Sequence, residues 1–119
     1  MNRFADFTIN RRATLLDAAE RIERNHSRAV IVTEGEKVIG VIGEGDVLRA
    51  LLNGVDIHAP LDDFVQHNFK YMHAPEPAEC LALFKRHGIT MVPIVDEEFR
   101  LTGVLTLQQV LEGMRAGGE

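Results

Sequence analysis

The chain has 119 residues, of which 45% are apolar, so it has the size and apolar content of one folded domain. Eighteen acidic against thirteen basic residues give a net charge of -5, which excludes an overall basic field for nucleic acid or anionic membranes. No apolar run reaches the roughly 18 residues of a membrane helix, and the first residues lack the apolar core of a signal peptide. We therefore expect a cytoplasmic protein without membrane insertion. The single cysteine, Cys80, excludes an internal disulfide and a thiolate zinc site.

The first half of the chain predicts five elements. In chain order they are an extended piece at 7–9, a helix over 15–22, strands at 29–32 and 38–42, and a helix that Asp46 opens. Thr14 or Asn10 is the expected N-cap of the first helix, because both side chains accept a backbone N–H. The polar turn at 34–37 makes the two strands a hairpin, and Asn53-Gly54 ends the second helix.

The second half predicts the same five elements in the same order. They are an extended piece at 71–72, a helix over 79–87, strands at 91–95 and 101–105, and a helix over 107–114. Gly88 is expected to end the first of these helices. Between the halves, residues 55–68 connect them, with Pro60 starting a short helical turn at 61–64.

The two halves are repeats of one unit. Gly40-Val41-Ile42 recurs as Gly103-Val104-Leu105, and the strand at 30–32 recurs at 93–95, both at an offset of 63 residues. A unit of about 50 residues buries too little apolar surface to be stable alone, so the halves should share a core. We expect an α/β (α+β) fold of two β-α-β-β-α repeats packed with pseudo-twofold symmetry. The first repeat spans 1–56, the connector 57–68 and the second repeat 69–119.

The repeat resembles a known family. Residues 89–96, a polar turn and then Leu101-Thr102-Gly103-Val104-Leu105-Thr106 look like the second half of a cystathionine-β-synthase (CBS) domain. Residues 29–46 are similar with fewer signature residues, and the resemblance extends from about residue 7 to residue 112. More narrowly, residues 45–54 resemble the CBS pairs attached to bacterial sugar nucleotidyltransferases.

This resemblance implies a CBS pair whose clefts bind adenosine-containing ligands, namely AMP, ADP, ATP or S-adenosylmethionine. Such modules usually regulate an attached or partner protein and commonly pair into flat dimers. The resemblance does not say which enzyme or transporter is regulated.

Asp46 is the main candidate of the first cleft. It stands six positions after Gly40, where the family has the carboxylate that binds the ribose hydroxyls. Alternatively Asp46 only caps the following helix, as Asp commonly does, and the two roles are compatible. Three positions after Gly40 the family usually has Ser or Thr, whereas this chain has Gly43, which keeps the amide and lacks the hydroxyl.

The second cleft has the opposite departure from the family pattern. Thr106 keeps the hydroxyl, but Gln109 stands where the family has Asp. A neutral amide should bind a ribose hydroxyl less strongly than a carboxylate does. Each cleft lacks one half of the motif, which predicts weak, altered or absent nucleotide binding and makes the Asp46 cleft the preferred site.

Further candidates follow from the family pattern: backbone groups for the purine edge, strand residues beside the adenine, and arginines for phosphate. Core packing is the more common role of such strand residues, and a surface arginine is more often a solvated side chain. The full set of candidate ligand-binding residues is Thr8, Ile9, Asn10, Arg28, Ala29, Val30, Gly43, Asp46, Arg49, Met72, Met91, Val92, Pro93, Thr106 and Gln109.

Catalysis is not expected of this chain. The five histidines show no metal-binding spacing, and the glycines at 40, 43 and 45 lack the rest of a dinucleotide fingerprint. No serine, cysteine or lysine has a recognisable nucleophile setting. We therefore expect no catalytic residues, no metal and no cofactor.

The leading hypothesis is a homodimeric, non-enzymatic regulatory module that senses an adenosine-containing ligand and regulates a partner or its own oligomer. One alternative is a structural dimerisation module with degenerate, ligand-free clefts. Another is the detached regulatory part of a sugar nucleotidyltransferase.

Overall fold

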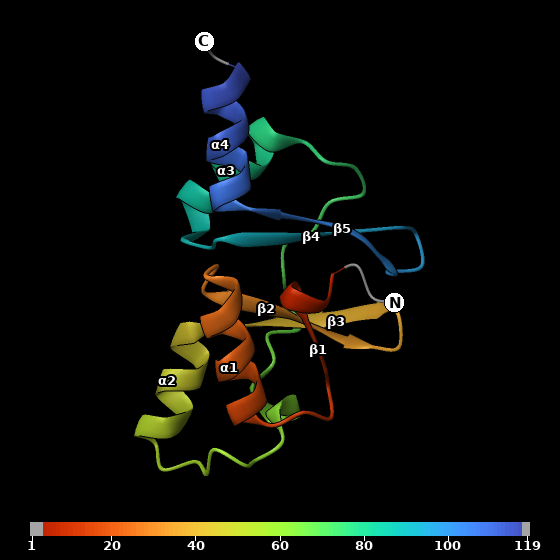
Figure 1. The fold of residues 1–119 in the computed structure, drawn as a ribbon. Coiled ribbons are helices and arrows are strands. Elements are labelled where there is room, and N and C mark those ends of the chain that lie inside the picture. Colours follow the sequence, from red (N-terminus) through yellow and green to blue (C-terminus); the bar gives the residue numbers. More distant parts are fainter. Residues whose placement is uncertain (1–3, 118–119) are drawn as a thin grey trace.

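The computed structural model describes residues 4–117, which form two similar halves with their sheets facing each other (Figure 1). Helices α1 and α2 lie outside the first sheet, and α3 and α4 lie outside the second. The first half consists of η1 (Ala5–Phe7), β1 (Thr8–Asn10), α1 (Leu15–Asn25), β2 (Ala29–Glu34), β3 (Lys37–Gly43) and α2 (Glu44–Leu52). The connector holds η2 (Leu61–Phe64), and the second half consists of α3 (Pro77–His87), β4 (Met91–Val95), β5 (Leu101–Thr106) and α4 (Leu107–Gly117).

The two sheets differ in their first strand. In the first half β1 pairs in parallel with β2, and β2 pairs antiparallel with β3. In the second half β4 and β5 form the same hairpin, but the extended piece expected at 71–72 is reduced to one parallel bridge between Met72 and Ile94. The expected order of elements is therefore confirmed, with a shorter first strand in the second repeat.

Local sequence signals explain most helix ends. Thr14 caps α1: its hydroxyl accepts from the Asp17 amide at 3.2 Å, and the Asp17 carboxylate accepts from the Thr14 amide at 3.0 Å. This accounts for the lowered pKa of Asp17, whose main cause is the backbone hydrogen bond from Thr14. α3 begins at Pro77, two residues earlier than expected, because proline is well suited to a first helical position. Gly88 ends α3 with a φ of 65°, as expected.

The halves share a core. Ala29, Ile31 and Val38 of the first sheet form one buried cluster with Met91 and Val95 of the second. A second cluster lies between the first sheet and its helices, and a third lies between the second sheet and its helices. Because the middle cluster is built from both sheets, neither half retains its full core alone.

The pseudo-twofold axis is visible in the hydrogen bonds between the halves. The Val38 amide donates to Phe99 O at 2.8 Å, and the Leu101 amide donates to Glu36 O at 3.1 Å. Each bond is the counterpart of the other at the repeat offset. The Thr90 hydroxyl also donates to the Ser27 carbonyl, its own counterpart 63 residues away. The two hairpins are thus joined directly at the axis.

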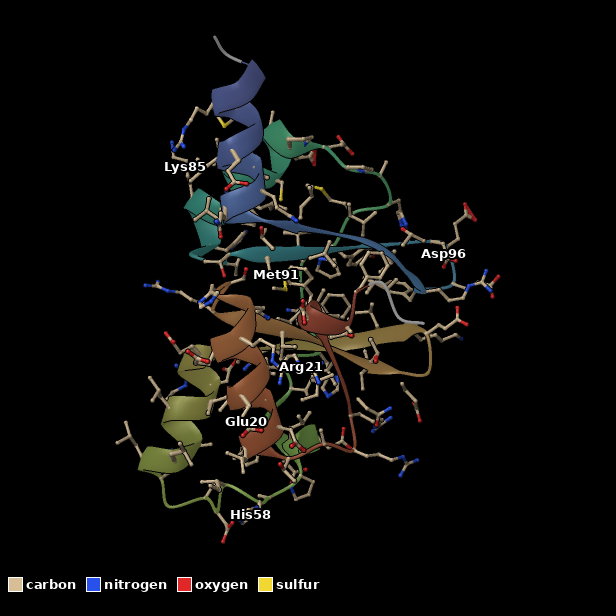
Figure 2. All side chains as sticks on the ribbon, in the orientation of Figure 1. Glu20, Arg21, His58, Lys85, Met91 and Asp96 are labelled. Carbon is tan, nitrogen blue, oxygen red and sulfur yellow. The ribbon has the colours of Figure 1, made fainter. Side chains whose placement is uncertain are left out.

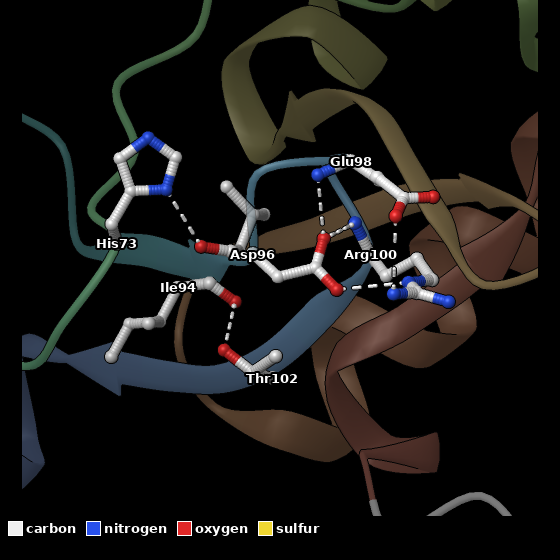
Figure 3. Close-up of polar contacts among 7 residues, drawn as sticks. His73, Ile94, Asp96, Glu98, Arg100 and Thr102 are labelled. Atoms are coloured by element: carbon white, nitrogen blue, oxygen red, sulfur yellow. Dashed lines mark hydrogen bonds and ion pairs between the residues drawn. The ribbon is translucent and has the colours of Figure 1, made fainter.

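The hairpin of the second half is held by Asp96 (Figure 3). Its carboxylate accepts from the amides of Glu98 and Arg100, each at 2.9 Å, and from Arg100 Nε at 2.8 Å. The hydrogen bond from the Arg100 amide is the main reason why the pKa of Asp96 is lowered. Asp96 therefore fixes the turn that carries Phe99 to the first half.

Candidate functional site

A cleft of about 470 Å³ opens between the two halves, on the side where α2 begins. Three parts of the chain line it: residues 28–29, 41 and 43–46 of the first half, residues 66 and 68 of the connector, and residues 69–70 and 87–91 of the second half. Because all three parts meet here, a ligand bound in this cleft would contact both repeats at once.

Asp46 lies at the wall of this cleft with its carboxylate 13% exposed. Its Oδ2 accepts from the Gly43 amide at 2.8 Å, so Asp46 does cap α2. The helix begins at Glu44, earlier than the expected start at Asp46, because a third-position carboxylate caps by reaching back. Its Oδ1 accepts from Arg49 Nη2 at 2.6 Å and from Gln66 Nε2 at 3.0 Å. Asp46 is therefore a helix cap and a cleft residue together.

The connector reaches the cleft by pairing with β3. The backbone amide of Gln66 donates to Val41 O at 2.8 Å, and the backbone amide of Val41 donates to Gln66 O at 3.1 Å. A Cβ on Gly40 would lie 2.2 Å from Val65 Cγ1 and 2.7 Å from Gln66 O, so only glycine allows this approach. Gly40 and Val41 thereby fix the backbone that carries Gln66.

The walls of the cleft offer both apolar and charged groups. Ala29, Phe69 and Met91 supply apolar surface, and Met91 lies in the layer between the two halves (Figure 2). Arg28 and Lys70 supply positive charge, and Glu44 supplies a carboxylate. Such a combination suits a ligand with a flat apolar ring at one end and an anionic group at the other.

The counterpart cap in the second half is a closed pair. The backbone amide of Gln109 donates to Thr106 Oγ1 at 3.1 Å, and the side-chain oxygen Oε1 of Gln109 accepts from the backbone amide of Thr106 at 3.1 Å. Thr106 is buried, at 3% exposure. The side-chain oxygen of Gln109 is thus engaged in capping α4. The other polar group of this side chain is the nitrogen Nε2, which donates hydrogen bonds and accepts none.

The candidate residues fall into groups with different surroundings. Five of them line the cleft: Arg28, Ala29, Gly43, Asp46 and Met91. The strand residues are core side chains, namely Val30, Met72, Val92 and Pro93. Arg49 lies on Asp46 with its side chain 68% exposed. Thr106 and Gln109 form the cap of α4.

Residues 8–10 lie elsewhere. Thr8, Ile9 and Asn10 border a separate groove of about 560 Å³ beside α1, where Arg21 donates to the carbonyl of Thr8. The reason is that β1 pairs with β2 and packs under α1. The Asp46 cleft is bordered by residues 66 and 68 of the connector and by residues 69–70 at the start of the second repeat.

Sequence reasoning missed Gln66, Phe69, Lys70 and His87 as cleft residues. One signal was available: a glycine inside a strand, Gly40, indicates a close approach by another segment. That signal does not identify the approaching segment.

The described residues contain no group of three or more His, Cys, Asp or Glu side chains that could hold a metal ion. Cys80 belongs to α3 and is buried in the core cluster of the second half, and burial raises the pKa of its thiol to about 11. No helix between residues 4 and 117 is both long and apolar enough to cross a bilayer.

The sequence model of the CBS domain family matches residues 1–53 and 71–116. Among solved structures, a CBS domain protein of Pyrobaculum aerophilum complexed with AMP is similar, with a TM-score of 0.75, 19% identity and coverage of 93% of this chain and 92% of that chain. A CBS domain pair/ACT domain protein of Thermotoga maritima is also similar, with a TM-score of 0.74, 24% identity and coverage of 92% and 88%.

Two curated relatives are similar over most of this chain. An uncharacterized protein of Helicobacter pylori (strain ATCC 700392 / 26695) is 36% identical over 101 residues, which are 82% of this chain and 30% of the relative. Arabinose 5-phosphate isomerase GutQ of Salmonella typhi is 30% identical over 97 residues, which are 80% of this chain and 30% of that enzyme. The chain thus spans about a third of the length of these relatives.

Proposed function

The chain belongs to the CBS domain family and forms a CBS-pair regulatory module, and on this premise we propose that its Asp46 cleft binds an adenosine-containing ligand. Binding joins the two halves and the connector, because all three line the cleft. The ligand thereby favours one arrangement of the halves, and it can do so only by binding that arrangement more tightly than others. The module acts on a partner protein or on its own oligomer, without catalysis.

The observation that carries this proposal is the arrangement around Asp46. A carboxylate is a good acceptor for the two hydroxyls of a ribose. Phe69 and Met91 supply apolar surface for a purine, and Arg28 with Lys70 supplies charge for a phosphate. The Pyrobaculum protein was solved with AMP, which makes AMP the first ligand to test.

Calorimetric titration with AMP, ATP and S-adenosylmethionine tests the proposal. We expect AMP to bind, and we expect Asp46→Asn to weaken its affinity about tenfold, since hydrogen bonds to a charged acceptor are worth more than those to a neutral one. Asp63→Asn is the matched control, because Asp63 is an exposed carboxylate of η2 outside the cleft. Absence of heat and of a thermal shift with all three ligands at millimolar concentration would contradict the proposal. It would favour the alternative of a structural module with ligand-free clefts.

The oligomeric part of the proposal is a homodimer through the outer helices. Leu48 and Leu51 of α2 and their counterparts Leu111 and Met114 of α4 are all exposed, between 38% and 54%. Because the repeat places equivalent apolar residues on both halves, a second copy related by a twofold axis can cover both pairs. We expect sedimentation to show a dimer, and the double variant Leu48→Asp, Leu111→Asp to be a folded monomer. A monomeric unmodified chain at high concentration would contradict this part.

The regulated partner is either attached to this module or a separate protein. The curated relatives are much longer than the segment they share with this chain, which agrees with a module that works beside another unit. A sugar nucleotidyltransferase is one candidate for the attached enzyme, because residues 45–54 resemble the CBS pairs of such enzymes.

A further inference from the structure

Asp46 has fewer open acceptor positions than a ribose requires. A carboxylate offers about four lone-pair positions. Three are occupied: the Gly43 amide binds Oδ2, while Arg49 and Gln66 both bind Oδ1. A ribose with two free hydroxyls donates two hydrogen bonds, so one of the three present donors must leave.

The three donors differ in how easily they can leave. The Gly43 amide is a backbone group fixed by the start of α2. Arg49 is charged and lies 2.6 Å from Oδ1, whereas the neutral amide of Gln66 lies 3.0 Å away. The Arg49 contact joins two opposite charges, and this adds a Coulomb attraction that the neutral amide of Gln66 lacks. Gln66 is therefore the donor that a ligand displaces.

Displacement of Gln66 requires only rotation of its side chain. Its backbone is paired in both directions with Val41, and the connector is packed against Gly40. These contacts do not involve the amide of the side chain, so they persist when the amide leaves Asp46. The backbone of the connector therefore stays in place, and only the side chain of Gln66 moves.

We propose that Gln66 is a specificity-determining residue of the Asp46 cleft: its amide competes with ribose hydroxyls for the carboxylate and must be displaced by a ligand that carries a free 2′,3′-diol. This inference rests on the proposed function. A ligand with a single ribose hydroxyl uses the one open position and leaves Gln66 in place. Gln66 therefore weakens the binding of ribonucleotides and leaves that of 2′-deoxyribonucleotides unchanged.

The test is calorimetric titration of the whole chain with AMP and with 2′-deoxy-AMP. We expect Gln66→Ala to bind AMP about two- to tenfold more tightly than the unmodified chain, which corresponds to the net contribution of one hydrogen bond. We expect its affinity for 2′-deoxy-AMP to stay the same. Gln66→Met, which keeps the side-chain length without the amide, should behave as Gln66→Ala does. Gln108→Ala is the matched control, since Gln108 is an exposed amide of α4 that bonds Glu112.

Three results would overturn the inference. If Gln66→Ala binds AMP equally or more weakly, while the unmodified chain binds it, Gln66 does not compete and the proposed function still stands. If both nucleotides gain equally, the variant has opened the cleft in general and the diol is not what Gln66 discriminates. If neither the unmodified chain nor Gln66→Ala binds either nucleotide, the proposed function and this inference fail together. Melting curves show whether each variant is folded before titration.

Discussion

Gly40 and Gly103 occupy equivalent positions in β3 and β5, yet their surroundings differ. A Cβ on Gly40 would meet Val65 and the backbone of Gln66 at 2.2 and 2.7 Å, whereas the atoms nearest to a Cβ on Gly103 belong to Ile94, the first at 3.4 Å. The first distances are impossible for real atoms and the second is ordinary contact. The same glycine is thus a structural requirement in one repeat, where the connector docks, and a replaceable residue in the other.

The helix caps show a similar contrast. In the first repeat the capping side chain is Asp46, whose second oxygen remains directed to partners from the cleft. In the second repeat Gln109 and Thr106 satisfy each other, and Gln109 has no second acceptor oxygen. Since both caps hold their helices, divergence between the repeats has changed the chemistry of the clefts while preserving the fold.

The largest expected effect separates the two glycines. Gly40→Ala should lower the free energy of unfolding by about 3 kcal/mol, because the methyl group forces the connector away from β3. Gly103→Ala should change it by less than about 1 kcal/mol, since its methyl group fits against Ile94. Urea unfolding of both variants measures the difference. Equal losses would show that connector docking does not distinguish the repeats.

The next effect concerns the caps. Asp46→Ala should cost about 1 kcal/mol of stability, because the Gly43 amide and Arg49 lose their acceptor. Gln109→Ala should cost about 0.5 kcal/mol, because Thr106 Oγ1 still accepts from the backbone of residue 109. Thermal unfolding checks the order of the two variants. A larger loss for Gln109→Ala would mean that the second cap, and not the first, is the stronger.

The hairpin turns differ in their dependence on pH. In the second hairpin Asp96 is hydrogen-bonded in the folded state, which lowers its pKa, so its stabilising contribution is present above the ordinary pKa of Asp and is lost as pH falls through the folded-state value. The first hairpin turns at Gly35, whose φ of 63° needs no such carboxylate. We expect Asp96→Asn to reduce the loss of stability between pH 5 and pH 3, measured by urea unfolding. An unchanged pH profile would contradict this role.

The last contrast lies at an equivalent core position of the first helix in each repeat. Ala18 in α1 and Cys80 in α3, which correspond at an offset of 62 residues, are both fully buried. Because burial raises the pKa of the Cys80 thiol to about 11, the folded protein should react with a thiol reagent at neutral pH far more slowly than the unfolded protein. Cys80→Ala, which gives α3 the residue of α1, should cost about 1 kcal/mol or less. Rapid labelling of the folded chain would show that α3 opens from its sheet.

Local patterns determined the elements of this protein. The apolar runs predicted both hairpins, Thr14 and Gly88 predicted the ends of α1 and α3, and the 63-residue offset predicted two halves with a shared core. These features depend on residues close together in the chain or on repetition, both of which are visible without a structure.

Only the tertiary structure decided which segments meet at the Asp46 cleft. The resemblance made residues 8–10 candidates for the purine edge of a ligand, but they border a separate groove beside α1, whereas residues 66 and 68–70 line the Asp46 cleft. The contact between Gln66 and Asp46 joins residues 20 apart through the docking of an irregular segment on β3. No periodicity records such docking, because it depends on the absence of a side chain at Gly40 and on the space that this absence leaves.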